Sequence, residues 1–490
     1  MAGGDIFFAN DKNRAKLSRA ATAGRLRRIA RGIYTEDLDS PAEEVVARHR
    51  WTIVAHLIPD AIIVDRSAAS GGAPAHGNLF VASTQRARDV ERPGLRIAVR
   101  EGERLASDLP WPCDLAIASH ARTLVDNLAV SRGRGRVART LTREELGDWV
   151  ARHALISGKE RLNRLRDEAK LIAEELGVPE RSEDIDAFIG AALGTHRAPS
   201  GSRALAARAD GSGFDDDRAR LFDRLATALA ELQPDDEVPE SLPAPPDEAL
   251  STVGFWEAYF SNFIEGTEFP VEQAQQIIAT GEPPADRRAD GHDVLGTYRI
   301  VTDLHDRART PDGPEAFQEL LRARNAEILA GRPGLGPGGW KDTPNQAGSY
   351  VFVAPSLVEG TLAEGFAHRE RIASPLGRAL YMFFVVSEVH PFADGNGRVA
   401  RATMNAELSA VGETRIVIPI VWRNEYFASL RQLSREGNSR LYVRTLAYAW
   451  RWTAAMNWFD APTTRAQLER SNALVDSTDA ARSGLQLLLP

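Results

Sequence analysis

The spacing of apolar residues predicts two consecutive helices in the last third of the chain. The apolar positions of the first are Leu376, Leu380, Phe383 and Phe384. They recur at helical spacing and predict a helix over residues 374–389. A second helix is predicted over residues 399–411, closed by Gly412, because glycine readily adopts the left-handed conformation that ends a helix. A short turn therefore lies between two helices and presents backbone N–H groups at the start of the second.

The same patterns elsewhere predict a mainly α protein that begins with an α+β module. Short apolar runs alternate with Gly and Pro between residues 60 and 120, which predicts a small β-rich segment. Helices are predicted over residues 143–177, 185–193 and 218–232, and a Gly/Ser/Asp-rich connector over 199–217. Residues 340–354 predict a β-hairpin inside an otherwise all-α domain.

A proline-rich acidic stretch suggests where the domains divide. Residues 233–248 hold five prolines and six acids, a composition typical of a semi-extended, self-repelling linker. We therefore predict four parts. They are an α+β module over 1–145, a helical connector and linker over 146–249, a catalytic domain over 250–462, and a terminal helix or tail over 463–490.

Composition limits the class of protein. The 490 residues are 43% hydrophobic and 26% charged, as in ordinary soluble proteins, and the net charge of −8 argues against wholesale coating of nucleic acid. The single cysteine, Cys113, excludes an internal disulfide and fits a reducing compartment. No apolar run is long enough to span a bilayer, and the N-terminus lacks a signal-peptide pattern. We expect a cytoplasmic protein without membrane contact.

The turn between the two predicted helices has the composition of an anion-binding site. Gly395 and Gly397 flank Asn396, and glycines let backbone N–H groups approach an anion closely. The start of the following helix adds partial positive charge. Arg398 and Arg401 lie three residues apart, so both guanidinium groups can flank one ligand. Gly-Asn-Gly alone would also fit a plain turn, but the whole set predicts a phosphate site.

Two further side chains of this turn suggest chemistry on that phosphate. His390 is the group here that titrates near neutral pH, so it is the candidate general base. Asp394 offers a hard carboxylate oxygen, which Mg²⁺ prefers together with phosphate oxygens and water. These residues predict attack of a hydroxyl on a nucleotide phosphate, driven by positioning and charge stabilisation.

The spacing His-x-Phe-x-Asp-Gly-Asn-Gly-Arg-x-x-Arg, from His390 to Arg401, resembles the signature of the Fic family. Members of that family transfer AMP from ATP to protein hydroxyls (AMPylation). The resemblance implies an all-α Fic-like domain with ATP as substrate and Mg²⁺ as cofactor. It also implies that Asn424 and Tyr426 lie near the nucleotide, and that the hairpin at 340–354 holds a target segment by backbone pairing.

A second motif resembles the inhibitory motif of Fic proteins. Ser261 and Glu265 lie four residues apart on one helix face, and Gly266 follows them. In those proteins the glutamate pairs with the second signature arginine, here Arg401. The carboxylate would take the place of the γ-phosphate and leave ATP misaligned. The position of the motif ahead of the signature implies inhibition from an N-terminal helix.

The N-terminus is locally basic. Its cationic residues are Lys12, Arg14, Lys16, Arg19, Arg25, Arg27, Arg28 and Arg31. A helix over residues 12–22, a hairpin over 26–35 turning at Arg31-Gly32, and a helix opened by a Ser40-Pro41-Ala42-Glu43 capping box suggest part of a winged helix. Residues 24–34 and 119–126 loosely resemble AbiEi-type antitoxins, which act as transcriptional regulators. DNA is therefore a candidate partner, and a basic solvated face is the structural alternative.

Several alternatives stay open at this stage. The same site could remove AMP from a modified protein, with Glu265 positioning water, or transfer another phosphate-containing group. The chain could also be a DNA-binding autoregulator whose Fic domain serves as a sensor. A protein with a Ser, Thr or Tyr hydroxyl is the expected target, the protein itself is a candidate for it, and a homo-oligomer is compatible with the sequence.

Overall fold

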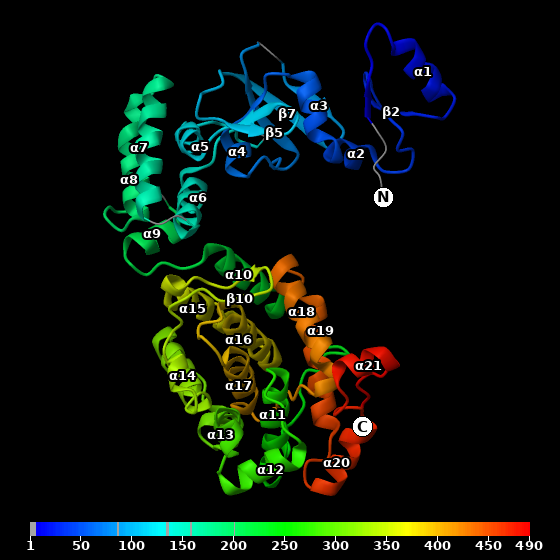
Figure 1. Cartoon of the computed structure of the whole chain (residues 1–490), viewed down its shortest axis with the longest axis vertical. Coiled ribbons are helices and arrows are strands. Elements are labelled where there is room, and N and C mark those ends of the chain that lie inside the picture. The colour runs from blue at the N-terminus through cyan, green and yellow to red at the C-terminus, as the bar shows by residue number, and fades with distance from the viewer. Residues whose placement is uncertain (1–5, 86–87, 134–136, 157–158, 200) are drawn as a thin grey trace. The chain divides into compact units, whose positions relative to one another are not determined.

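The computed structural model describes residues 6–85, 88–133, 137–156, 159–199 and 201–490 (Figure 1). It divides into two compact units, Met1–Gly211 and Ser212–Pro490. The finer divisions at residues 145, 249 and 462 stay predictions. The mainly α architecture with an α+β first module is confirmed.

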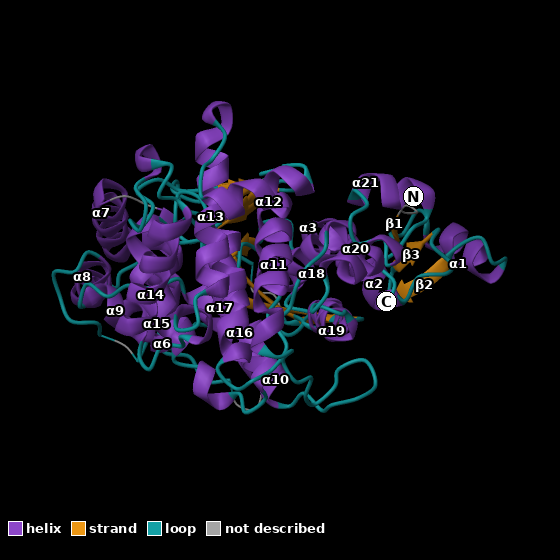
Figure 2. Ribbon diagram, turned by 90° about the horizontal axis from the view of Figure 1, so that it is seen from below, coloured by secondary structure: helices purple, strands orange, loops and turns teal. Residues whose placement is uncertain are grey.

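The first unit opens with a small antiparallel sheet beside a helix (Figure 2). Its elements are β1 (Ile6–Phe8), α1 (Arg14–Thr22), β2 (Arg27–Ala30) and β3 (Ile33–Thr35), with strand order β1-β3-β2. The hairpin turns at Gly32, whose φ of +77° suits glycine, as the sequence predicted. The predicted capping box is wrong: Pro41 is the N-cap of α2 (Ala42–Arg48), and no side chain caps this helix. Ser40 instead turns its carbonyl to Arg27, which donates to it.

A six-stranded mixed sheet forms the core of the first unit, where the sequence predicted a β-rich segment. Its strands are β4 (Ile62–Ile63), β5 (Asn78–Ser83), β6 (Val90–Arg92), β7 (Leu95–Glu101), β8 (Leu109–Trp111) and β9 (Leu115–Ile117), in the order β6-β7-β5-β4-β9-β8. The pairs β5–β7 and β4–β9 are parallel. Helices α3 (Arg50–Leu57), α4 (Asp65–Ala69) and α5 (His120–Asn127) accompany the sheet. Ile63, Val81 and Ile97 are fully buried in this core.

Helices complete the first unit. They are α6 (Arg143–Ile156), α7 (Lys159–Glu175), α8 (Ser182–Ala192) and α9 (Arg203–Ala209). The stretch predicted as helical over 143–177 holds α6 and α7, and residues 157 and 158 of it lie outside the described residues. The predicted connector at 199–217 contains α9, because the Ser202 hydroxyl caps it by accepting from the backbone N–H of Leu205.

The second unit is a helical domain. Its helices are α10 (Asp216–Ala230), α11 (Leu250–Ile264), α12 (Val271–Thr280), α13 (Arg288–Thr302), α14 (Pro314–Ile328), α15 (Val358–Phe366), α16 (Pro375–Val389), α17 (Asn396–Ser409), α18 (Arg423–Glu436), α19 (Arg440–Ala455), α20 (Ala461–Arg470) and α21 (Ser477–Ser483). A hairpin of β10 (Gln346–Ala347) and β11 (Tyr350–Val351) lies within the stretch predicted as one. Figures 1 and 2 show α16 and α17 side by side within this unit, with α11 beside α17.

Helix α16 is buried on almost all sides, which explains its apolar sequence. Ser374 caps it and Pro375 occupies its first turn, where a missing N–H costs nothing. Phe383 and Phe384 are fully buried, and each such ring contributes about 1.5–3 kcal/mol of burial free energy. The predicted second helix begins at Asn396, three residues earlier than expected.

Helix α11 brings an aromatic face into the same domain. Phe255, Tyr259 and Phe260 are buried in a cluster with Trp452 of α19. The aromatic face of α11 is therefore core packing, which fixes the helix that carries Ser261 and has Glu265 as its C-cap.

The proline-rich stretch 233–248 lies within the second unit. Ser241 Oγ and Leu242 N donate to the carboxylate of Glu413 at 2.6 and 2.7 Å, and Thr414 N donates to Leu242 O at 2.7 Å. This stretch thus packs against the segment that follows α17. Within the described part of the chain, none of the helices combines the length and apolar character needed to cross a membrane.

Candidate active site

The signature turn joins the C-terminus of α16 to the N-terminus of α17. His390 is the C-cap of α16 with φ of +52°, and Gly395 is the N-cap of α17 with φ of +79°. A non-glycine residue at positive φ costs energy and is retained where surrounding contacts enforce it. The Asn396 side chain closes the turn, since it accepts from Phe392 N and donates to Phe392 O, both at 2.9 Å. The backbone of the turn is therefore held in place before any ligand binds.

The imidazole of His390 lies in a buried environment that favours its neutral form. Its Nδ1 lies 3.3 Å from the carbonyl oxygen of Ser387, which can only accept, so Nδ1 carries the hydrogen and Nε2 keeps its lone pair. The ring of Phe352 stacks on it, with centroids 3.9 Å apart and planes 9° apart. Burial lowers the pKa of His390 to about 4. The imidazole is therefore uncharged at neutral pH.

The carboxylate of Glu265 lies against the glycine turn. A methyl group added to Gly397 would overlap Oε1 of Glu265 and lie 3.0 Å from Nη1 of Arg401. Arg401 Nη2 donates to Glu265 Oε1 at 2.8 Å, and Arg401 Nε donates to the Ser261 hydroxyl at 2.9 Å. Helix α11 ends here, and Gly266 has φ of +88°. The anion that this turn accommodates in the structure is the protein's own carboxylate.

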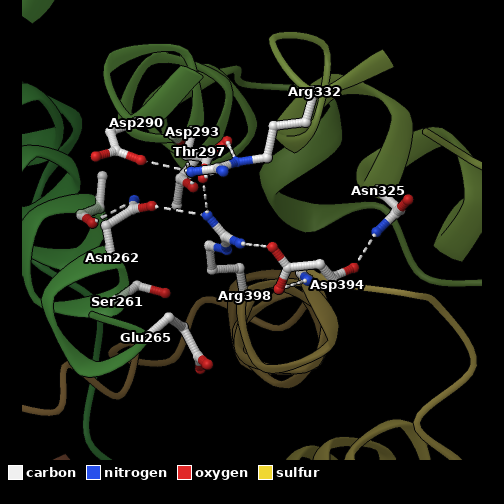
Figure 3. A network of polar contacts seen from close by, with 12 residues as sticks. Ser261, Asn262, Glu265, Asp290, Asp293, Thr297, Asn325, Arg332, Asp394 and Arg398 are labelled. Carbon is white, nitrogen blue, oxygen red and sulfur yellow. Dashed lines mark hydrogen bonds and ion pairs between the residues drawn. The ribbon is translucent and has the colours of Figure 1, made fainter. Parts of the chain in front are cut away.

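Arg398 has a different set of partners, shown in Figure 3. Its Nη1 donates to Asp293 Oδ2 of α13 at 2.6 Å and to Asn262 Oδ1 at 3.3 Å, and its Nη2 donates to Asp394 Oδ2 at 3.3 Å. Asp293 also accepts from Arg332 Nε at 2.9 Å, and its side chain is fully buried. Burial raises the pKa of Asp293, and the two arginines oppose that rise. Arg398 is thus oriented by Asp293 before any ligand arrives.

Asp394 supplies the carboxylate of the turn, and its side chain is 45% exposed to solvent. Its Oδ1 accepts from Gly395 N at 2.6 Å, and its backbone carbonyl accepts from Asn325 Nδ2 at 2.9 Å. Among the described residues, no three His, Cys, Asp or Glu side chains are grouped so that they could hold a metal ion. One carboxylate beside a phosphate site nevertheless fits Mg²⁺, which takes the rest of its oxygens from phosphates and water.

A cavity of about 270 Å³ opens over the turn. Residues from the turn, from α11 and α18 and from the hairpin line it, among them Glu265, Tyr350, His390, Gly397, Tyr426 and Arg431. Tyr426 OH accepts from Arg401 Nη1 at 3.2 Å, and burial raises the pKa of Tyr426 to about 12. Asn424, the other residue expected near the nucleotide, is not among the residues that line this cavity. Its Nδ2 donates to the carbonyl of Ser477 at 3.3 Å.

The base of the hairpin is tied to the turn. Lys341 Nζ donates to Asn345 Oδ1 at 2.7 Å and to the carbonyl of Val389 at 3.3 Å, and burial lowers the pKa of Lys341 to about 8. Asn345 Nδ2 donates to the carbonyl of Phe392 at 3.0 Å. Lys341 thus satisfies a carbonyl at the end of α16, where helices leave such groups unpaired.

Four residues that shape this site carry no recognisable motif in the sequence. Asn262, Asp293, Phe352 and Glu388 contact Arg398, His390 or the hairpin. Asp293 and Glu388 are each next to an apolar residue in their helices. A carboxylate at a buried helix position indicates that other groups must pair with it. Their partners, however, lie more than thirty residues away and leave no mark in the local pattern.

These features define a class of helical domain in which a glycine turn joins two buried helices. The turn and the start of the second helix carry a histidine, a carboxylate and two arginines. Residues 316–408 match the model of the Fic/DOC family. This stretch of the chain is therefore similar to the Fic/DOC family, and the resemblance stated from the signature is confirmed.

Curated relatives are similar to part of the chain. Protein adenylyltransferase fic-1 of Caenorhabditis briggsae is 26% identical over 198 residues, 39% of this chain and 39% of that protein. Protein adenylyltransferase Fic of Nematostella vectensis is 25% identical over 249 residues, 49% of this chain and 57% of that protein. The chain thus spans well under two thirds of the length of these relatives. A solved structure of Fic-1 residues 134–508 from C. elegans is 18% identical and covers 70% of this chain and 94% of that one, with a TM-score of 0.35.

Proposed function

We propose that this protein transfers AMP from ATP to a hydroxyl side chain of a protein. The observation that carries the proposal is that His390, a neutral imidazole, lines the same cavity as the anion-accommodating turn at Gly397. A base and a phosphate site within one cavity provide what phosphoryl chemistry requires, namely positioning and charge stabilisation. The curated relatives that match part of the chain are named protein adenylyltransferases, which supports the same reaction.

In the proposed step the hydroxyl oxygen of the target attacks the α-phosphorus of ATP. Its proton passes to Nε2 of His390, the bond from the α-phosphorus to the bridging oxygen breaks, and pyrophosphate leaves. The N–H groups at the start of α17 and the guanidinium of Arg401 would stabilise charge on the phosphates. Asp394 would hold Mg²⁺, which when bound neutralises phosphate charge.

We also propose that Glu265 inhibits this reaction in the parent protein. Its carboxylate pairs with Arg401 at 2.8 Å and lies against Gly397, in the space that an ATP phosphate would need. The carboxylate and the phosphate therefore compete for one guanidinium and one backbone surface. ATP can align for transfer only once Glu265 has moved.

The reaction can be tested with the full chain and ATP labelled on either phosphate. Label from α-labelled ATP should enter protein in Glu265→Gly at a higher rate than in the parent. Label from γ-labelled ATP should not enter in either. His390→Ala in the Glu265→Gly background should abolish incorporation without altering the circular dichroism spectrum. Incorporation from the γ-phosphate, or equal rates in Glu265→Gly and its His390→Ala derivative, would refute the proposal.

A specific observation favours DNA as a second partner. Seven of the eight cationic side chains between residues 12 and 31 are exposed, one just before α1 and the others on α1, the hairpin β2–β3 and the segment joining them. Exposed cations on a helix beside a hairpin suit contacts to DNA phosphates. The joint substitution of Arg28 and Arg31 by Ala should weaken binding of a labelled duplex and reduce its salt dependence. The same change at the exposed pair Arg161 and Arg164 of α7 is the matched control, and equal effects of both pairs would exclude a dedicated site.

A further inference from the structure

A buried carboxylate next to the candidate base has no part in the proposed transfer. Glu388 lies two residues before His390, near the end of α16, and is only 2% exposed. A buried charge is costly unless other groups pair with it and donate hydrogen bonds to it. The groups that satisfy Glu388 therefore indicate what this carboxylate does.

Side chains from three different elements contact the carboxylate of Glu388. Arg218 of α10 forms an ion pair with it, with Nε 2.7 Å from Oε1, and the Tyr350 hydroxyl of β11 donates to the same oxygen. The Ser434 hydroxyl of α18 donates to Oε2 at 2.6 Å. One carboxylate thus joins α16, α10, α18 and the hairpin.

Arg218 holds the hairpin at two further points. Its Nη2 donates to the backbone carbonyl of Val351 at 2.8 Å. Its guanidinium lies 4.8 Å from the centroid of the Tyr350 ring, within the range of a cation–π contact. Both residues of β11 are therefore fixed to the pair that Arg218 forms with Glu388.

The residue that follows β11 is Phe352, whose ring stacks on the imidazole of His390. Its backbone N–H donates to the carbonyl of Asn345 at 3.1 Å, across the base of the hairpin. The aromatic rings of Tyr350 and Phe352 also meet edge to face at 5.7 Å. A change in the position of β11 must therefore change the position of the ring that covers His390.

We propose that Glu388 and Arg218 are positioning residues that latch the hairpin, so that Phe352 stays stacked on the imidazole of His390. This inference deepens the proposed function, because it rests on His390 as the base and concerns its orientation and its access to the target. Arg218 lies about a hundred residues ahead of the stretch that matches the Fic/DOC model. The site thus depends on a helix outside that stretch.

Two mild substitutions test the latch. Tyr350→Phe removes only the hydroxyl that donates to Glu388, which keeps its contacts with Arg218 and Ser434. Arg218→Met removes the guanidinium and keeps an apolar stem. Tyr448→Phe, which removes a hydroxyl that donates to Leu487 O at 2.8 Å, and Arg220→Met on the same helix α10 are the matched controls.

The first measurement is amide hydrogen exchange of residues 345–352 in the full chain. Loss of a hydrogen bond to a charged group should speed exchange at the Phe352 amide by about tenfold or more in Tyr350→Phe. Arg218→Met should speed it further, and the two controls should leave it unchanged.

The second measurement is the NMR resonance of the His390 ring Cε1–H, assigned by its disappearance in His390→Ala. A stacked phenyl ring shifts this resonance upfield, so both latch variants should move it downfield. Hairpin exchange equal to that of the controls, or an unmoved His390 resonance, would overturn the inference. Absence of AMP transfer in Glu265→Gly would refute the proposed function but not this inference, because neither of these measurements depends on activity.

Discussion

Replacing the carboxylate of Glu265 by an amide isolates its charge, because Glu265→Gln keeps the size and shape of the side chain. The Arg401 side chain is 4% exposed and that of Glu265 is 28% exposed. A hydrogen bond between charged groups contributes about 1.5–3 kcal/mol. Exposure of one partner reduces this value, so we take about 1–2 kcal/mol as the free energy that ATP must overcome.

That free energy corresponds to an ATP affinity about 5- to 30-fold higher in Glu265→Gln than in the parent. Glu265→Gly should show a larger gain, because an amide oxygen can still accept from Arg401 and still lies against Gly397. The predicted order of affinity is therefore Glu265→Gly, then Glu265→Gln, then the parent.

Isothermal titration with ATP and Mg²⁺ measures these affinities in the full-length protein. Glu268→Gln is the matched control, since Glu268 is an exposed glutamate three residues further along the same segment. It should bind ATP as the parent does. If all four proteins bound ATP equally and unfolded at the same temperature, competition between this carboxylate and a phosphate would be ruled out.

Three further predictions concern the base, the support of Arg398 and the core. Because burial lowers the pKa of His390 to about 4, the imidazole stays neutral as pH falls from 8 toward the acid range. AMP transfer by Glu265→Gly should therefore not lose this base until pH approaches that value, and a fall centred near the ordinary histidine pKa would contradict the burial argument. Asp293→Asn leaves Arg398 without its buried counter-charge and should lower the free energy of unfolding by about 3–5 kcal/mol in urea. The partly exposed Asp290→Asn on the same helix should cost less, and equal costs would contradict the assignment. Phe260→Ala should cost about 3–5 kcal/mol because its ring is fully buried. Phe459→Ala, at a 59% exposed ring, is its control and should change stability little.

Local patterns were sufficient to predict most helices and the hairpins, because helical and strand periodicities are properties of neighbouring residues. These local patterns failed where the first residue of a helix depends on a single capping interaction. The predicted box at Ser40 is replaced by Pro41 as N-cap, and the predicted connector holds α9 because Ser202 caps it. Such hydrogen bonds depend on backbone geometry that residue type alone does not determine.

By itself the sequence determined which functional groups the turn carries, because His390, Asp394 and the two glycines lie within a few residues of one another. The tertiary structure decided which groups hold that turn. Asp293 meets Arg398 across 105 positions of the chain, and Arg218 reaches Glu388 across 170. Local periodicity carries no information about such partners, because only the packing of α10, α13 and the hairpin around α16 and α17 brings their charges within hydrogen-bonding distance.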